Sequence, residues 1–500
     1  MSAGRSVLEF LLPDGRADTV GVLGSGTPSL LRPPSPPVEP PWDLTVVAPS
    51  EREARSRFSV DATARAAAHS VSGDGLVYVV APLITRLRLG HALRQAGLAV
   101  SSGMLHLPDK GTSQVLLALD RRALREVARR LVAPGVGRTT LQVAAALGAG
   151  RWLRCHPRAA LLARRPGARP LGEWLGIPGA GTIADLLVAI RVRRHAHRER
   201  VVMHLQPIDG RAGVAKAMLR PDASGGEIRV EAKALADQAP AARAAGAEVP
   251  SCRVVELAPG SDVLVQDVVD GAPAVWTLSR ADTAFEPLIV QLGAWLARWG
   301  SATRVVRRPG GDFFRRMLLD PATGLAERLP DGAGYLSWLE HRCRLVEEME
   351  VPLVATHGDL TMSNILLRSD GRLGIVDWEA AEPSGLPLTD FYYSVVDAAA
   401  AQSSYRDWPG AFDRCFRLQG PTMAVVRLVG QRLARALEAT DEVATLAFHA
   451  CWLRHAANER QKRAPGEPTP FLRHLQSAAG LRDVIHLQEA TRGQDLSAAF

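Results

Sequence analysis

The chain has few cysteines, and they form no pattern. Five cysteines occur among 500 residues and no C-x-x-C pair is present: Cys155, Cys252, Cys343, Cys415 and Cys451. An odd, scattered set argues against a disulfide framework and against a zinc site. It favours reduced thiols. We therefore expect a cytoplasmic protein.

Long apolar runs and long basic runs are also missing from the sequence. No stretch of about 20 apolar residues could cross a membrane, and the first residues, MSAGRSVLEF, hold no apolar run long enough for a signal peptide. The formal net charge is +8, but arginine is spread along the whole chain without a long basic run. Such a distribution indicates composition bias more than a nucleic-acid-binding face. We expect neither a nucleic-acid partner nor a membrane partner, and the sequence leaves the oligomeric state open.

The 500 residues are enough for two or more domains. The hydrophobic content of 47% and the charged content of 22% are typical of a globular protein with a core. A proline-rich linker, PPSPPVEPP, ends a first segment at residues 1–41. Residues 136–180 carry two Pro-Gly pairs, Pro166-Gly167 and Pro178-Gly179, and a third pair, Pro134-Gly135, directly precedes them; this predicts a connector with one or two short helices. Residues 476–500 are expected to form a tail.

Residues 42–135 alternate between strand-like and helix-like segments, which predicts an α/β domain. The expected strands are 44–48, 75–81, 97–100 and 114–119, and the expected helices are 50–68, 83–96 and 121–131. The runs GDGLVYVVAP, HALRQAGLAV and QVLLALD loosely resemble the C-terminal half of class I methyltransferase domains. The glycine-rich cofactor turn and the acidic ribose-binding residue of that family are missing. The resemblance therefore implies a shortened domain without methyl transfer, used for scaffolding or dimerisation.

The strongest motif lies between Val354 and Asp377, in VATHGDLTMSNILLRSDGRLGIVD. Asp359 and Asn364 are five residues apart on one loop. A predicted hairpin follows and brings Asp377 and Glu379 close to them. Oxygen ligands that converge in this way suit a hard cation such as Mg²⁺, with one carboxylate left to orient a hydroxyl nucleophile. An ordinary hairpin explains the turn at Asp370, but it does not explain the occurrence of His357, Asp359, Asn364 and Asp377 together at this spacing.

The patterns H-G-D-x-x-x-x-N and I-V-D-W-E resemble the aminoglycoside phosphotransferase and choline kinase group, small-molecule relatives of the protein kinases. The resemblance implies that Asp359 is the catalytic base and that Asn364 and Asp377 bind Mg²⁺. Glu379 stands where the family often has a further acidic residue. The co-substrate would be ATP or GTP, and the acceptor a hydroxyl of an aminoglycoside, sugar or amino alcohol.

The same resemblance implies an α+β fold with a bilobal, protein-kinase-like domain: a β-rich small lobe at 181–270 and a helical large lobe at 271–475. Strands are expected at 186–192, 201–206, 214–219, 253–257 and 263–269, with a helix at 226–238. Lys216 would bind the α- and β-phosphates. Glu231, with Glu227 as the competing candidate, would pair with it. Backbone groups around Gln266 and Val268 would bind adenine, and Asp390 would cap the catalytic loop.

One segment departs from this family. The loop at 193–198 reads Arg-Arg-His-Ala-His-Arg, where the family has small residues whose backbone N–H groups approach the phosphates. Side-chain cations could replace those amides, or nucleotide binding could be altered. The alternative function is therefore a non-catalytic pseudokinase that acts as a binding or assembly module.

Overall fold

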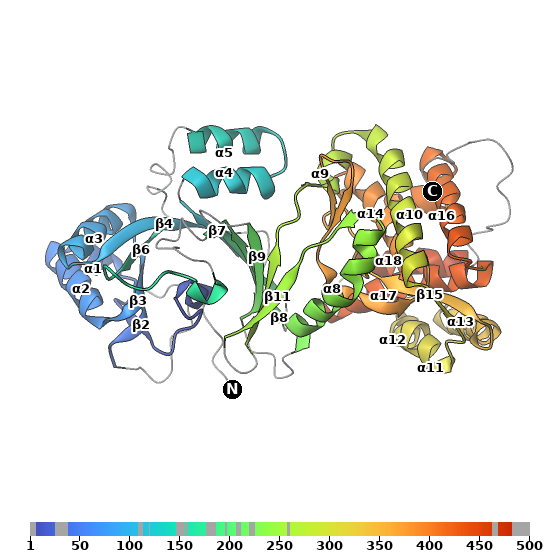
Figure 1. Cartoon of the computed structure of the whole chain (residues 1–500), viewed down its shortest axis with the longest axis horizontal. Helices are drawn as coiled ribbons and strands as arrows, with labels where there is room; N and C mark the ends of the chain where they lie inside the picture. Colours follow the sequence, from blue (N-terminus) through green and yellow to red (C-terminus); the bar gives the residue numbers. More distant parts are fainter. Residues whose placement is uncertain are drawn as a thin grey trace. The chain divides into compact units, whose positions relative to one another are not determined.

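The computed structural model divides the chain into two compact units (Figure 1). Unit 1 comprises Met1–Ala232 and Ser251–Val268, and unit 2 comprises Lys233–Pro250 and Val269–Phe500. The structure describes residues 7–25, 39–108, 114–119, 121–146, 156, 159–176, 187–195, 198–206, 212–219, 226–257, 261–462 and 469–482. Most of the proline-rich linker, the centre of the loop at 193–198 and the tail beyond residue 482 lie outside these residues.

Unit 1 contains one mixed sheet of eleven strands within the described residues. The three parallel strands β1, β2 and β3 stand at one edge, and every other pairing is antiparallel. Across the sheet the strands are β1 (Val20–Leu23), β2 (Trp42–Val47), β3 (Val71–Val80), β6 (Ala159–Arg164), β4 (Ala99–Pro108), β5 (Gln114–Ala118), β7 (Leu187–His195), β8 (Arg198–Leu205), β9 (Gly213–Met218), β12 (Asp262–Asp267) and β11 (Cys252–Glu256).

The pairing of β5 with β7 joins the N-terminal strands to the strands predicted for the small lobe, in a register from Gln114↔Val192 to Leu117↔Ala189. One hydrophobic core crosses this junction, because Leu76 and Leu116 belong to the same buried cluster as Ile190 and Met203. The predicted connector supplies α5 (Val136–Ala146), η2 (Glu173–Leu175) and also β6, an inner strand of the sheet. The domain boundaries and the methyltransferase resemblance stay predictions.

Helices cover the sheet of unit 1 where its strands alternate between two buried faces. On β3, Leu76 and Tyr78 enter the core shared with β5 and β7, whereas Val77 and Val79 pack under α2 (Arg57–Ser70) and α3 (Leu83–Gln95). Alternation of this kind follows from the two-residue period of a strand. The helix expected at 50–68 is in fact α1 (Glu51–Arg55) followed by α2, because Ser56 is extended and its side chain caps α2. The helix α4 (Arg121–Arg130) buries Leu124 and Val127.

Unit 2 is mainly helical. Its helices include α9 (Ala274–Leu278), α10 (Phe285–Thr303), α11 (Gly311–Phe314), α12 (Asp320–Leu325), α13 (Gly332–Glu347), α14 (Thr389–Gln402), α15 (Trp408–Phe416), α16 (Pro421–Ala436), α17 (Asp441–Lys462) and α18 (Pro470–Leu481). The helix α14 is buried along nearly its whole length, from Thr389 to Ala401. It is therefore the central helix of the unit. The helix α8 (Gly226–Ala244) begins in unit 1, and its residues after Ala232 belong to unit 2.

Two small sheets accompany these helices. One has the order β10 (Ala247–Glu248), β17 (Leu373–Ile375), β16 (Ile365–Leu367), β13 (Ala272–Pro273), and the other has the order β14 (Val305–Arg307), β15 (Val351–Thr356), β18 (Glu382–Gly385). The predicted hairpin after Asn364 is the antiparallel pair β16–β17. The predicted α+β class, with a β-rich part followed by a helical part, is confirmed. None of the helices that the structure describes is long and apolar enough to cross a membrane.

The shared core of unit 1 predicts a large effect at the junction between its two sets of strands. Leu116→Ala, at a fully buried position of β5, should lower the free energy of unfolding by about 2–5 kcal/mol, because it removes apolar contacts and leaves a cavity. Urea denaturation measures this change. Leu87→Ala, on the 61% exposed position of α3, is the matched control and should change stability little. Equal effects of the two variants would contradict a core shared across the junction.

Candidate functional site

The loop that follows β15 begins with His357-Gly358-Asp359 and depends on a glycine in its second position. Gly358 has a φ of +75°, in the left-handed region that favours glycine. A Cβ there would lie 2.3 Å from the carbonyl oxygen of Ala380 and would clash with it. The motif needs Gly358 because of both the dihedral angle and this close approach.

His357 anchors the loop from inside. Its side chain is fully buried, and its ring lies edge-on to Trp378 with the ring centroids 4.9 Å apart. Nδ1 accepts a hydrogen bond from the backbone N–H of Asp359, and Nε2 lies 3.1 Å from the carbonyl oxygen of Val376, to which it donates. Burial lowers the pKa of His357, against the opposing effect of nearby carboxylates. The neutral ring is therefore a structural link between the loop and the strand β17.

The side chains of Asp359 and Asn364 meet across the loop. Nδ2 of Asn364 donates to the backbone oxygen of Asp359 at 2.9 Å and to its carboxylate Oδ2 at 3.3 Å. Both contacts use the amide nitrogen, so Oδ1 of Asn364 remains a possible ligand atom. The backbone oxygen of Asn364 accepts from the N–H of Val376, directly before Asp377. The hairpin β16–β17 thus brings Asp377 beside Asn364.

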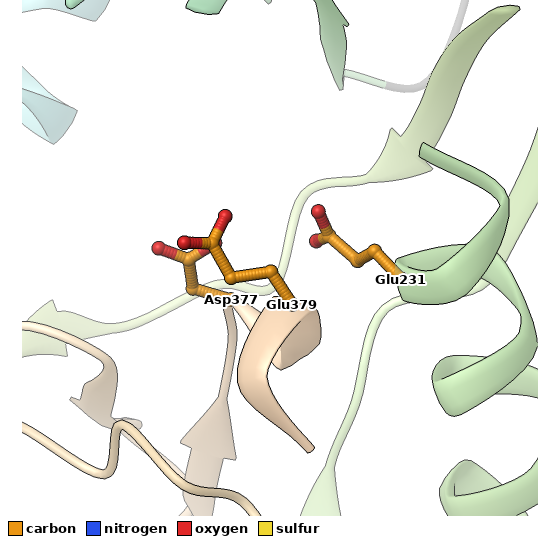
Figure 2. A group of neighbouring side chains, drawn as sticks. All are labelled: Glu231, Asp377 and Glu379. Atoms are coloured by element: carbon orange, nitrogen blue, oxygen red, sulfur yellow. The ribbon is translucent and has the colours of Figure 1, made fainter. Parts of the chain in front are cut away.

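Asp377 and Glu379 complete this group. Asp377 adopts a left-handed conformation with φ 70° and ψ 61°, which is rare for a residue other than glycine and is often found at functional sites. Glu379 lies in η6 (Trp378–Ala380), and one carboxylate oxygen of each residue lies within 4.8 Å of the other. Figure 2 shows the two carboxylates side by side; it also draws Glu231, which belongs to unit 1. The donor set is all oxygen, as Mg²⁺ prefers.

In unit 1 the structure pairs Lys216 with Glu231. Nζ of Lys216 on β9 lies 2.6 Å from Oε1 of Glu231 on α8, and both side chains are buried. Nε2 of Gln266 also donates to Oε1 of Glu231, at 3.1 Å. The competing candidate Glu227 lies 3.7 Å from Arg200, whose guanidinium is also 4.0 Å from Glu231. Sequence analysis did not anticipate either the side-chain role of Gln266 or Arg200.

The backbone around Gln266 and Val268 is hydrogen-bonded within unit 1. The N–H of Val268 donates to the carbonyl oxygen of Ala212, and the N–H of Asp267 donates to that of Ser251. Gln266 itself pairs with Val214 on β9 and with Cys252 on β11. The N–H groups of Asp267 and Val268, which lie in the segment expected to bind adenine, therefore have protein partners. Adenine binding in this segment stays a prediction.

The glycine-free segment at 193–198 continues the strand pairing. The register of β7 and β8 extends to His195↔Arg198, so only residues 196 and 197 connect the two strands. The backbone ladder thus extends over most of the segment in which the family has its phosphate-binding loop.

The helix α14 holds the backbone of the Asp359 loop through three buried polar side chains. Asp390 accepts from the N–H groups of His357 (2.6 Å) and Gly358 (2.8 Å), which agrees with the capping role predicted for it. Ser394 donates to the carbonyl oxygen of Leu360, and Asp397 accepts from the N–H of Met362 at 2.6 Å. Sequence analysis missed Ser394 and Asp397, although their spacing of four and seven residues from Asp390 places them on one face of a helix.

Asp397 is buried at a cost. Burial raises the pKa of its carboxyl to about 6, while the hydrogen bonds from Met362 and Tyr405 act in the opposite direction. Burial also raises the pKa of Tyr393, and the negative charge of Asp359 adds to that effect.

The buried pair of Lys216 and Glu231 predicts that replacing the lysine alone strongly destabilises unit 1, whereas replacing both residues does not. Lys216→Met should lower the free energy of unfolding by about 3–5 kcal/mol, because it leaves the Glu231 carboxylate buried without its closest cation. The double variant Lys216→Met/Glu231→Leu should recover most of that loss in urea denaturation. Lys233→Met is the matched control, since its 2.6 Å pair with Asp237 is exposed and should contribute little. Additive losses in the double variant would contradict the coupling.

The pKa of Asp397 predicts a pH-dependent contribution to stability. The folded state binds this proton more tightly than the unfolded state, whose carboxyl has the ordinary value of 3.8, so the contribution of the group to folding rises as the pH falls from 6 to 4. At pH 7 the ionised group costs about 3 kcal/mol. Asp397→Asn should therefore be more stable than the wild type at pH 7, with the difference shrinking towards pH 4 in denaturation series. Asp413→Asn, at an ion pair with Arg417, controls for loss of a charge. A variant less stable than the wild type at pH 7 would refute the assignment.

The chain is similar to known proteins at low sequence identity. Three solved structures illustrate the likeness: an aminoglycoside phosphotransferase from Alicyclobacillus acidocaldarius (16% identity, 58% of this chain and 88% of that chain, TM-score 0.31), one from Streptomyces rimosus in complex with ADP and streptomycin (15%, 50% and 90%, 0.31), and Plasmodium vivax ethanolamine kinase (10%, 59% and 81%, 0.36). A comparison with curated proteins found no match. The model of the phosphotransferase enzyme family matches residues 208–429, which include Lys216, Glu231, Asp359, Asn364 and Asp377. This match covers the motif around Asp359 and confirms the resemblance that the motif carries.

Proposed function

We propose that this protein transfers the terminal phosphate of MgATP or MgGTP to a hydroxyl group of a small molecule. The observation that carries the proposal is the grouping of Asp359, Asn364, Asp377 and Glu379 around one hairpin-supported loop. The match of this region to the phosphotransferase enzyme family supports it. In-line phosphoryl transfer needs positioning and charge neutralisation more than covalent chemistry by the protein.

Each residue of the group has a proposed role. Asp359 orients the acceptor hydroxyl and accepts its proton. Asn364 through Oδ1, together with the carboxylates of Asp377 and Glu379, holds Mg²⁺. When bound, the ion would neutralise charge on the phosphoryl group.

The nucleotide-binding residues proposed on unit 1 are Lys216, Glu231, Gln266 and Val268. Lys216 binds the α- and β-phosphates, and Glu231 and Gln266 hold its side chain in place through the contacts at 2.6 and 3.1 Å. The carbonyl groups around Gln266 and Val268 remain candidates for adenine binding. The proposed acceptor is an aminoglycoside, a sugar or an amino alcohol, as the resemblance of the motif implies.

A second candidate function rests on the hairpin between β7 and β8. The segment at 193–198 contains no glycine, and residues 193–195 and 198 take part in the strand pairing, which disfavours a close approach of this backbone to phosphates. If that change abolishes nucleotide binding, the protein is a pseudokinase that serves as a binding or assembly module.

Nucleotide binding separates the two functions. MgATP or MgGTP at about 100 times its dissociation constant should add about 2.7 kcal/mol to the stability of the wild type. Asp377→Ala should lose most of this shift in thermal unfolding, because it removes a proposed metal ligand. The matched control is Asp370→Ala, in the exposed turn of the same hairpin. Absence of a shift with either nucleotide would favour the pseudokinase.

The role of Asp359 predicts a catalytic defect without a binding defect. Asp359→Asn should lower kcat by about 10²–10⁴-fold, the range expected for loss of a general base. Nucleotide protection in thermal unfolding should persist, since Asp359 is not among the proposed phosphate ligands. Product formation is measured with labelled nucleotide and a panel of hydroxyl acceptors. Retention of wild-type kcat would exclude Asp359 as the base.

A further inference from the structure

One face of α14 binds the backbone on both sides of Asp359. Asp390, Ser394 and Asp397 are spaced by four and then three residues, so that their side chains leave the helix in one direction. Asp390 binds the N–H groups at positions 357 and 358, before Asp359. Ser394 and Asp397 bind the backbone at positions 360 and 362, between Asp359 and Asn364.

The second half of the loop has its own buried network, centred on one carboxylate oxygen. Oδ2 of Asp397 accepts from the N–H of Met362 at 2.6 Å and from the hydroxyl of Tyr405 at 3.2 Å. The side chain of Ser363 lies near Tyr405 and lowers the pKa of its hydroxyl, against the larger effect of burial. Met362 and Ser363 directly precede Asn364, so this network holds the part of the loop that delivers the amide to Asp359.

Tyr405 reaches Asp397 because the chain turns back sharply after α14. Ser404 and Tyr405 both have positive φ values, of 51° and 60°, which cost energy for residues other than glycine. Their N–H groups donate to the carbonyl oxygens of Ala401 and Ala400, which closes the end of the helix. Unfavourable backbone geometry is retained where the surrounding structure or the function requires it.

The burial of Asp397 also indicates a functional role for this residue. Only 2% of the residue is exposed, and a carboxylate in such a place loses its hydration and is disfavoured. A buried charge that weakens the fold and also contacts a candidate catalytic loop is a candidate for a functional role.

We propose that Asp397, assisted by Tyr405, is a positioning residue that fixes the second half of the Asp359 loop and thereby aligns Asp359 and Asn364 for phosphoryl transfer. The inference rests on the proposed function for its catalytic part. Its structural part, the holding of residues 360–364, can be measured without any reaction.

The test compares Asp397→Ala, Asp397→Asn and Tyr405→Phe in the full chain. Asp397→Ala removes the acceptor, so amide hydrogen exchange in residues 360–364 should accelerate and kcat should fall at least about tenfold, since small misplacements of reacting groups are costly. The KM for the nucleotide should change less than about threefold, because contacts with the phosphates are not removed. Asp397→Asn keeps an acceptor oxygen and should recover most of kcat. Tyr405→Phe should give a smaller defect of the same kind.

Asp413→Asn on α15 is the control and should leave both exchange and kcat unchanged. Unchanged loop exchange in Asp397→Ala would overturn the proposal, whatever the activity. Faster exchange with an unchanged kcat would overturn the catalytic part and leave a structural contact. If the wild type phosphorylates no acceptor, the proposed function fails, while the exchange data still decide whether Asp397 holds the loop.

Discussion

The N–H groups of His357 and Gly358 both donate hydrogen bonds to the buried carboxylate of Asp390. The arrangement of the candidate site in unit 2 depends on these two hydrogen bonds. The loop turns at Gly358 with a positive φ, and the two amides of this turn donate to the side chain of Asp390. Buried N–H groups require partners, and a carboxylate provides strong, short hydrogen bonds. With the turn fixed, Asp359 projects next to Asn364, and the hairpin β16–β17 can bring Asp377 to the same place.

A helix that is buried along its length is well suited to this task. The apolar residues of α14 pack within unit 2, so the helix is held rigidly, and three of its polar side chains, those of Asp390, Ser394 and Asp397, bind the loop backbone. Rigid elements position functional groups more accurately than loops do. The loop therefore takes its geometry from a helix that begins 30 residues after Asp359.

In unit 1 the strands that carry Lys216 and Gln266 belong to a sheet that extends through β5 into the N-terminal strands. The shared core around Leu116 and Ile190 makes the N-terminal region part of the support of the Lys216–Glu231 pair. An edge strand exposes unpaired backbone groups, and β5 covers that edge of β7. The N-terminal region thus has a physical role as a partner of the strands that carry Lys216 and Gln266, whatever further role it has.

The sequence by itself determined the chemistry of the site and most of the local elements. The motif of Asp359, Asn364 and Asp377, the hairpin after Asn364 and the alternating strands of unit 1 follow from residue spacing, turn residues and hydrophobic period, which act over a few positions. The tertiary structure alone decided that β6 lies inside the sheet, that Gln266 binds Glu231 and that Asp397 holds Met362. These contacts join residues 35 or more positions apart or strands that are not consecutive in the chain. Their specificity comes from burial and from the need to satisfy buried polar groups, which local sequence patterns do not encode.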